Sequence, residues 1–261
     1  MISQELIEVG GRKVDLRRTG AGEPLVYLHS AMGDFWMPEF LEKVAEHYEV
    51  LCPAHPGFGD STGMEEIADI EDLAFHYADV FDELGLWPLH LVGASLGGWI
   101  AAEIAVRWPD KLRSLTLIDA VGIWVDETPL APMWGVQPEQ LVDMLFADRS
   151  HPIAQLILSI DIDDPPPEEI LLPFINQQAA TAKVGWDPYL HNPKLAARLA
   201  RIKCPTLVIW GEQDGLAPVE YGKRYAALIP GARFEVIPGG HLAILEQPDL
   251  VSRLLLRSPS E

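Results

Sequence analysis

A serine, a histidine and an aspartate stand in this chain where they could together carry out nucleophilic acyl transfer. Ser95 lies in Gly93-Ala94-Ser95-Leu96-Gly97, between an apolar run and an alanine-rich helical stretch. Glycine at positions 93 and 97 permits a sharp strand-to-helix turn, so that the serine hydroxyl projects above the sheet. The helix that follows directs backbone N–H groups and its dipole at a developing oxyanion. This context predicts a nucleophile elbow at Ser95.

A serine hydroxyl is barely ionised near neutral pH, so it needs an imidazole to take its proton and a carboxylate to orient that imidazole. His241 follows a Gly-Gly pair in IPGGHLAILE, and Asp214 follows the apolar run TLVIW. Asp119, in LTLIDAVG, also ends an apolar run and is an alternative acid, as is Glu212. The pattern predicts Ser95 as nucleophile, His241 as general base and Asp214 as the orienting acid.

The elements that must position these residues alternate between strand and helix. Residues 5–18 alternate around Gly10-Gly11, which predicts an opening β-hairpin. Residues 67–86 carry apolar side chains at helical spacing. Short apolar runs predict further strands at 25–28, 88–92, 114–118 and 206–210. We therefore expect an α/β fold with a mostly parallel sheet covered by helices on both faces.

Residues 122–200 break this alternation, because many prolines divide the segment into short helical pieces. Its large apolar side chains, such as Trp124 and Trp186, are candidates for a substrate pocket. We expect a helical cap at 122–200 inserted into a core formed by residues 1–121 and 201–261.

The order serine, acid, histidine resembles the α/β-hydrolase family, over almost the whole chain apart from the inserted segment. The run LVYLHSAMGD is similar to the family's oxyanion loop, which usually begins His-Gly, whereas this chain has Ser30 at the second position. The resemblance implies that the backbone N–H of Ala31, or of Met32, acts with that of Leu96 as oxyanion donor. It also implies that His29 organises the loop.

Composition excludes several partners. The 261 residues include 39 acidic and 19 basic side chains, and the formal net charge of −20 disfavours nucleic acid and anionic membranes. The N-terminal residues contain no signal-peptide core, and no apolar stretch is long enough to span a membrane. Gly57 and Gly59 lack the third glycine of a dinucleotide-binding motif, and the histidines lack metal-ligand spacing. We expect a cytoplasmic protein with a small-molecule substrate, no cofactor and no metal; the sequence carries no signal for an oligomeric state.

Serine at the elbow excludes attack on an alkyl carbon, because the resulting ether could not be hydrolysed. We expect a carboxylesterase-like hydrolase acting on small to medium, largely uncharged esters. The alternative is a carbon–carbon bond hydrolase of vinylogous diketones, whose family members typically have a glycine-rich loop after the oxyanion histidine and a tryptophan after the catalytic histidine. This chain has HSAMGD and Leu242 instead, and its candidate cations for such anionic substrates are Arg149, Lys183 and Arg198. A perhydrolase-like side reaction and a binding protein with little turnover are further alternatives.

Overall fold

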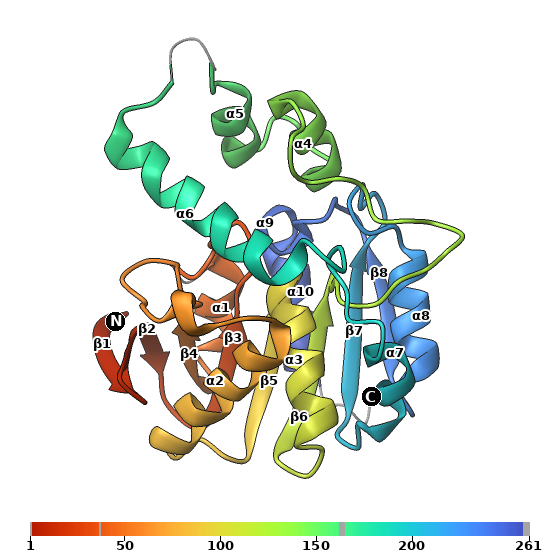
Figure 1. Cartoon of the computed structure of the whole chain (residues 1–261). Coiled ribbons are helices and arrows are strands. Elements are labelled where there is room, and N and C mark those ends of the chain that lie inside the picture. Colours follow the sequence, from red (N-terminus) through yellow and green to blue (C-terminus); the bar gives the residue numbers. More distant parts are fainter. Residues whose placement is uncertain (1, 37, 162–164, 258–261) are drawn as a thin grey trace.

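The computed structural model describes residues 2–36, 38–161 and 165–257. An eight-stranded sheet runs through the molecule in the order β1-β2-β4-β3-β5-β6-β7-β8 (Figure 1). β2 pairs antiparallel with β1 and with β4, and all the later neighbours pair in parallel. The strands are β1 (Ser3–Val9), β2 (Arg12–Gly20), β3 (Glu23–Leu28), β4 (Tyr48–Pro53), β5 (Leu89–Ala94), β6 (Leu112–Ile118), β7 (Thr206–Gly211) and β8 (Arg233–Ile237). The predicted α/β fold with a mostly parallel sheet is confirmed.

The predicted hairpin and strands coincide with observed elements. Gly10 and Gly11 both have positive φ, +58° and +81°, as a tight hairpin turn between β1 and β2 requires. In β3, Leu25 and Tyr27 face one side of the sheet while Val26 and Leu28 face the other. This alternation builds two separate apolar layers, one on each face of the sheet.

Helices cover both layers. α1 (Glu39–Val44), α9 (Ala243–Glu246) and α10 (Pro248–Leu256) contribute side chains to the layer that contains Leu25 and Tyr27. The layer on the opposite face contains side chains of α2 (Ile70–Glu83), α3 (Leu96–Arg107) and α8 (Glu220–Leu228). α2 starts later than the predicted 67–86 because Asp69 caps it, accepting hydrogen bonds from the N–H groups of Glu71 and Asp72.

The chain between β6 and β7 is helical, as expected. It contains α4 (Pro138–Leu145), α5 (Pro152–Leu158), α6 (Glu168–Gly185), α7 (Leu195–Arg198) and the short 3₁₀ helix η2 (Leu199–Arg201); a second 3₁₀ helix, η1 (Met64–Glu66), precedes α2. Figure 1 shows α4, α5 and α6 beyond one end of the sheet. The division of the chain into a core and a cap at residues 122–200 remains a prediction.

The expectation that the prolines divide residues 122–200 into short helical pieces is wrong at Pro173, which lies inside the 18-residue α6. It lies in the second turn, where its missing N–H removes one helical hydrogen bond and the later turns continue. Pro138 and Pro152, in contrast, are the first residues of α4 and α5, where proline is well tolerated. No helix in the described ranges is long and apolar enough to span a membrane.

Candidate active site

Ser95 lies on a strained turn between β5 and α3. Its φ is +50° and its ψ is −111°, outside the regions that a non-glycine residue normally adopts. The turn is held by a 2.9 Å hydrogen bond from the Ser95 N–H to the carbonyl of Ile118 on β6. A Cβ at Gly93 would lie 2.3 Å from the carbonyl oxygen of Gly97, and a Cβ at Gly97 would lie 2.0 Å from that of Leu28. Glycine is therefore required at both positions, as the sequence predicts for a nucleophile elbow.

The structure brings Ser95, His241 and Asp214 into one hydrogen-bonded line. His241 Nδ1 lies 2.8 Å from Asp214 Oδ2, and His241 Nε2 lies 2.8 Å from Ser95 Oγ. Because a carboxylate only accepts hydrogen bonds, Nδ1 carries the proton of a neutral imidazole and Nε2 is free to accept the serine hydroxyl. Ser95, Asp214 and His241 are 6%, 7% and 3% exposed, so the line is shielded from bulk water. This is the geometry in which an imidazole removes a serine proton.

Asp214 is fixed by its own loop. Its second oxygen, Oδ1, accepts hydrogen bonds from the N–H groups of Leu216 at 2.9 Å and Ala217 at 2.8 Å. These bonds leave Oδ2 directed at His241. The carboxylate is thereby oriented before any substrate arrives.

Asp119 and Glu212, the alternative acids, are placed differently. Asp119 Oδ1 accepts a 2.7 Å hydrogen bond from the N–H of Gly211 at the end of β7, and Oδ2 has no hydrogen-bond partner within the described residues. Burial, together with the nearby Asp214 carboxylate, raises the pKa of Asp119 well above its usual range. Glu212 is exposed. Among the three acids, the hydrogen bond to the His241 imidazole belongs to Asp214.

The residue that departs from the family pattern, Ser30, has a structural role in the loop after β3. Its hydroxyl donates to Asp34 and accepts a 3.1 Å hydrogen bond from the N–H of Met32. The Met32 N–H is thus already hydrogen-bonded within the loop. No hydrogen bond within the described residues uses the N–H of Ala31 or of Leu96. Leu96 follows Ser95 directly, and the loop that contains Ala31 follows β3, which pairs with β5. Of the two predicted loop donors, the Ala31 N–H is therefore the one without a hydrogen bond among the described residues.

His29 and His55 stabilise the same loop. Their rings stack with centroids 3.6 Å apart. His29 Nδ1 donates to the Ser30 carbonyl at 2.7 Å, while Nε2 accepts the His55 N–H at 2.9 Å. Burial lowers the pKa of His29 to about 3, so this imidazole is neutral at pH 7 and both of its nitrogens are occupied. These contacts agree with the expected loop-organising role of His29.

The inserted segment contacts both loops that carry the acid and the base. The Met144 carbonyl accepts a 3.1 Å hydrogen bond from the Gly215 N–H, and the Leu145 carbonyl accepts a 2.9 Å bond from the Leu242 N–H. Of the candidate pocket residues, Trp186, at the end of α6, is 65% exposed and Trp124 is 37% exposed.

Three residues with clear structural roles near the site carried no recognisable sequence signal. Asp34 is buried and accepts hydrogen bonds from Tyr27 and Ser30, yet its position beyond the oxyanion loop is ordinary for a turn residue. Glu103 has the spacing of an exposed helical acid but is fully buried. Gln178, on α6, contacts Ala31 across 147 residues of chain.

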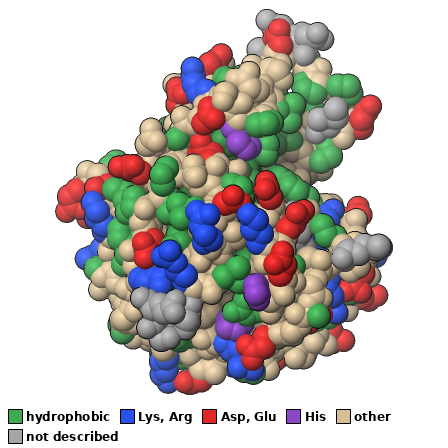
Figure 2. Space-filling view, turned by 180° about the vertical axis from the view of Figure 1, so that it is seen from behind, with side chains coloured by type: hydrophobic (Ala, Val, Ile, Leu, Met, Phe, Trp, Pro, Cys, Tyr) green, Lys and Arg blue, Asp and Glu red, His purple; other side chains and the backbone are tan. Residues whose placement is uncertain are grey.

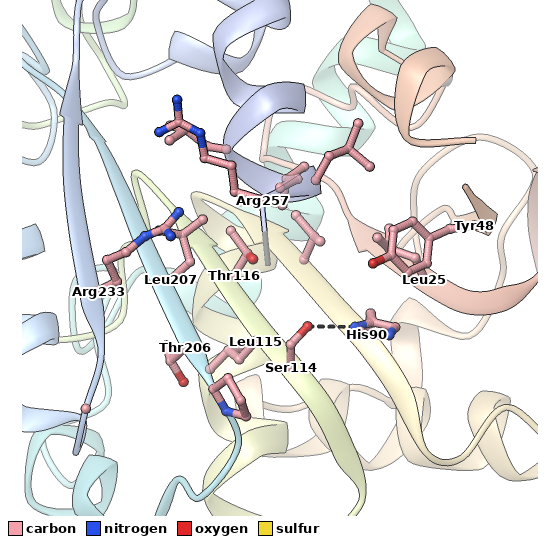
Figure 3. Close-up of a pocket in the computed structure, with 16 residues that line it drawn as sticks. Leu25, Tyr48, His90, Ser114, Leu115, Thr116, Thr206, Leu207, Arg233 and Arg257 are labelled. Atoms are coloured by element: carbon pink, nitrogen blue, oxygen red, sulfur yellow. Dashed lines mark hydrogen bonds between the residues drawn. The ribbon is translucent and has the colours of Figure 1, made fainter. Parts of the chain in front are cut away.

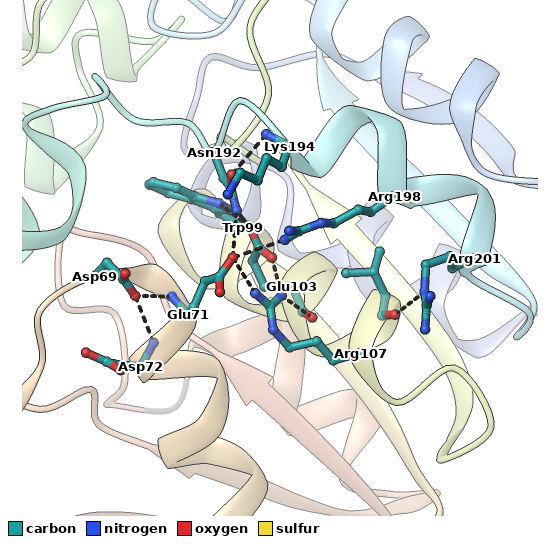
Figure 4. A network of polar contacts seen from close by, with 11 residues as sticks. Asp69, Glu71, Asp72, Trp99, Glu103, Arg107, Asn192, Lys194, Arg198 and Arg201 are labelled. Atoms are coloured by element: carbon teal, nitrogen blue, oxygen red, sulfur yellow. Dashed lines mark hydrogen bonds and ion pairs between the residues drawn. The ribbon is translucent and has the colours of Figure 1, made fainter.

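Glu103 belongs to a polar network that joins α2, α3 and the chain after α6 (Figure 4). It accepts a hydrogen bond from Asn192 Nδ2 at 2.8 Å and forms an ion pair with Arg107. Arg107 also pairs with Glu71 at 2.8 Å, and Arg198 reaches the same Glu71 oxygen at 3.0 Å. The hydrogen bond from Arg198 lowers the pKa of Glu71. The network links the end of the inserted segment to α3, the helix that follows Ser95.

A separate cavity of about 140 Å³ lies at the opposite edge of the sheet, beside the beginnings of the parallel strands (Figure 3). Its lining includes Tyr48, His90, Ser114, Arg233 and Arg257, and contains none of the three aligned residues. The cavity is therefore distinct from the candidate active site. Nowhere in the described ranges do three His, Cys, Asp or Glu side chains gather as a metal ion would require.

Comparisons with known proteins agree with this architecture. A 2-hydroxy-6-oxo-6-phenylhexa-2,4-dienoate hydrolase of Burkholderia cepacia is 29% identical, over 94% of this chain and 90% of the relative. A solved thermophilic esterase from Thermogutta terrifontis superposes with a TM-score of 0.71 at 26% identity, covering 97% of this chain and 96% of the other. A meta-cleavage product hydrolase from Pseudomonas fluorescens gives a TM-score of 0.78 at 21% identity, with 96% and 95% covered; this likeness shows the fold alone.

The model of the alpha/beta hydrolase family matches residues 25–254, which include the elbow, both strand-end acids and the histidine. The match spans most of the chain, and the sheet order and the aligned serine, histidine and aspartate fit it. The chain belongs to the alpha/beta hydrolase family.

Proposed function

We propose that this hydrolase cleaves carboxylic esters of small to medium, uncharged substrates through an acyl-enzyme on Ser95. The observation that carries the proposal is the hydrogen-bonded line from Ser95 Oγ through His241 to Asp214, with both links at 2.8 Å. The same line, on a strained elbow at a helix N-terminus, is the constellation that serine acyl transfer uses.

In the first half-reaction, Ser95 Oγ attacks the ester carbonyl carbon as His241 Nε2 takes the hydroxyl proton. The carbonyl oxygen becomes an oxyanion, which accepts hydrogen bonds from the N–H groups of Ala31 and Leu96. His241 then gives its proton to the departing alkoxide, so that an alcohol leaves and an ester to Ser95 remains.

In the second half-reaction, His241 takes a proton from water, and the hydroxide attacks the acyl carbon. Collapse of this second tetrahedral intermediate breaks the bond to Ser95 Oγ, which recovers its proton from His241. A carboxylic acid leaves. Asp214 accepts the hydrogen bond from His241 Nδ1 throughout and stabilises the imidazolium formed in each half.

The negative charge of the chain favours an uncharged substrate. The net charge is −20, and on the face in Figure 2 lysine and arginine side chains lie among aspartates and glutamates. The three cations that could hold a substrate carboxylate are engaged elsewhere. Arg149 pairs with Asp143 at 2.8 Å, Lys183 donates to the carbonyls of Met64 and Glu65, and Arg198 pairs with Glu71.

A carbon–carbon bond hydrolase acting on vinylogous diketones is the second candidate, because a specific observation favours it. Relatives from Burkholderia cepacia and from Comamonas testosteroni, 29% and 27% identical over 94% of this chain, are named dienoate and dienedioate hydrolases. Such substrates carry carboxylates, so this activity calls for a positive group near the site, and the three candidate cations are already engaged.

A direct comparison of p-nitrophenyl butyrate with 2-hydroxy-6-oxo-6-phenylhexa-2,4-dienoate, under identical conditions, tests the choice. The ester proposal predicts the higher kcat/KM for the butyrate. It also predicts that a carboxylate-bearing ester is cleaved more slowly than its neutral analogue, with a gap that narrows as salt screens the field. Turnover of the dienoate faster by an order of magnitude or more would reject the ester proposal in favour of the carbon–carbon hydrolase.

A further inference from the structure

Helix α6 of the inserted segment touches the predicted oxyanion loop directly. Gln178 Nε2 donates a 3.3 Å hydrogen bond to the carbonyl oxygen of Ala31. One residue earlier, the Gln177 amide packs so closely on the loop that a Cβ at Gly33 would lie 2.8 Å from its Oε1. In Figure 1, α6 crosses the end of the sheet from which this loop emerges.

The contact fixes one peptide plane of the loop from both sides. The Ala31 carbonyl and the Met32 N–H belong to the same peptide group, and the Met32 N–H donates to Ser30 Oγ at 3.1 Å. Gln178 holds the carbonyl end of that group at 3.3 Å. Because a peptide group is planar, the two bonds together set the torsion that follows the Ala31 Cα and oppose a flip of the group. The N–H of Ala31, the predicted oxyanion donor, belongs to the preceding peptide group, whose Ser30 carbonyl accepts hydrogen bonds from His29 Nδ1 at 2.7 Å and from the Gly33 N–H at 3.1 Å. The two peptide groups meet at the Ala31 Cα, so Gln178 completes the set of bonds that orients this donor.

α6 does not depend on Gln178 for its own attachment. Lys183 Nζ donates to the carbonyl of Met64 at 2.7 Å and to that of Glu65 at 3.0 Å. Ala180 packs into the apolar cluster formed with Phe35, Ala54 and Phe58. Removing the Gln178 amide therefore frees the Ala31 carbonyl while α6 stays in place.

We infer that Gln178 is a positioning residue for oxyanion stabilisation, which couples the seating of α6 on the core to completion of the oxyanion site. This inference rests on the proposed function, since it assumes a Ser95 oxyanion. Its chemical consequence is selective: a misplaced donor weakens binding of the tetrahedral state and leaves binding of the planar ester nearly unchanged.

The test compares Gln178→Ala and the isosteric Gln178→Glu with Asn176→Ala, an exposed position on the same helix. For each protein at pH 8, kcat and KM are measured with p-nitrophenyl butyrate. A trifluoromethyl ketone, which adds to a catalytic serine and forms an oxyanion, is compared with the methyl ketone of equal length, which stays planar. In the glutamate variant a carboxylate oxygen replaces the donor and repels the Ala31 carbonyl.

We expect both Gln178 variants to lose about tenfold in kcat, with KM changed less than about twofold, because an indirect displacement costs less than loss of a donor. The trifluoromethyl ketone should bind about tenfold more weakly and the methyl ketone as before. Asn176→Ala should match the unmodified protein. Unchanged kcat and ketone affinity in the Gln178 variants, or equal weakening of both ketones, would overturn the inference alone. If the trifluoromethyl ketone does not bind the unmodified protein, or binds Ser95→Ala equally well, the proposed function itself is overturned.

Discussion

Ser95 Oγ and His241 Nε2 lie 2.8 Å apart, although 146 residues separate them in the chain. The sheet order explains this approach, because β5 and the strands that follow it bring their carboxyl ends to one edge. Asp214 reaches the same edge from the end of β7. Parallel pairing thus assembles a site whose members are dispersed in sequence.

Exchange of Asp214 for asparagine tests the role of the acid. Asp214→Asn should lower kcat by about 10⁴, because an amide in that position no longer fixes the imidazole tautomer. Asp119→Asn is the matched control, since the Asp119 carboxyl contacts the Gly211 N–H rather than His241. Steady-state kinetics of both variants decide the matter: a larger loss in the Asp119 variant would transfer the role of acid to the end of β6.

The agreement between sequence and structure is greatest where local chemistry leaves few choices. The glycines around Ser95 predict the elbow, because close backbone contacts there leave no room for a side chain. Gly10-Gly11 predicts the hairpin turn, because the positive φ values of that turn disfavour other residues. The apolar runs predict β3, β5, β6 and β7 because buried parallel strands need such runs. β8 was not among the predicted strands, because its side chains alternate with charged residues at the sheet edge.

Contacts made across the fold could not be predicted in this way. The contact between Gln178 and Ala31 depends on where α6 crosses the sheet, which no periodicity in α6 specifies. The choice between Ala31 and Met32 likewise required the position of the Ser30 hydroxyl. Burial of Glu103 follows from the packing of three segments around it.

Buried histidines should make the free energy of unfolding depend on pH. Burial, with a contribution from the Arg12 charge, lowers the pKa of His76 to about 4, and its Nε2 has no hydrogen-bond partner among the described residues. Between pH 6.5, its ordinary value, and about 4, the unfolded chain binds a proton that the folded chain does not. The contribution of His76 to the free energy of unfolding is therefore complete above this range. It is lost on acidification, by up to about 1.4 kcal/mol per pH unit for one histidine.

His76→Leu should remove this part of the pH dependence of the free energy of unfolding, because leucine does not titrate and suits the apolar environment. Urea unfolding at pH 7, 6 and 5 should give a shallower fall for the variant than for the unmodified protein. His29, whose pKa is lowered to about 3, and His55 remain in the variant and keep part of the slope. Parallel curves for the two proteins would show that His76 is protonated equally in the folded and unfolded states.

Loss of the buried carboxylate of Glu103 should be strongly destabilising. Glu103 is fully buried and serves Arg107, Trp99 Nε1 and Asn192 Nδ2, so Glu103→Ala leaves several polar groups without their partner. We expect the free energy of unfolding to drop by about 3 kcal/mol. Asp110→Ala, which removes an exposed ion pair with Lys203, should cost less than about 1 kcal/mol. Similar denaturation midpoints for the two variants would mean that the network of Figure 4 contributes no more than a surface pair.

The central claim is that His241 activates Ser95 as the nucleophile, and covalent labelling by a fluorophosphonate tests it most directly. Peptide mass spectrometry should locate one adduct on Ser95, and Ser95→Ala should show none and lose about 10⁶ in kcat. His241→Ala should fold normally yet label far more slowly, because no base removes the hydroxyl proton. An adduct on another residue, with turnover surviving in Ser95→Ala, would contradict the account.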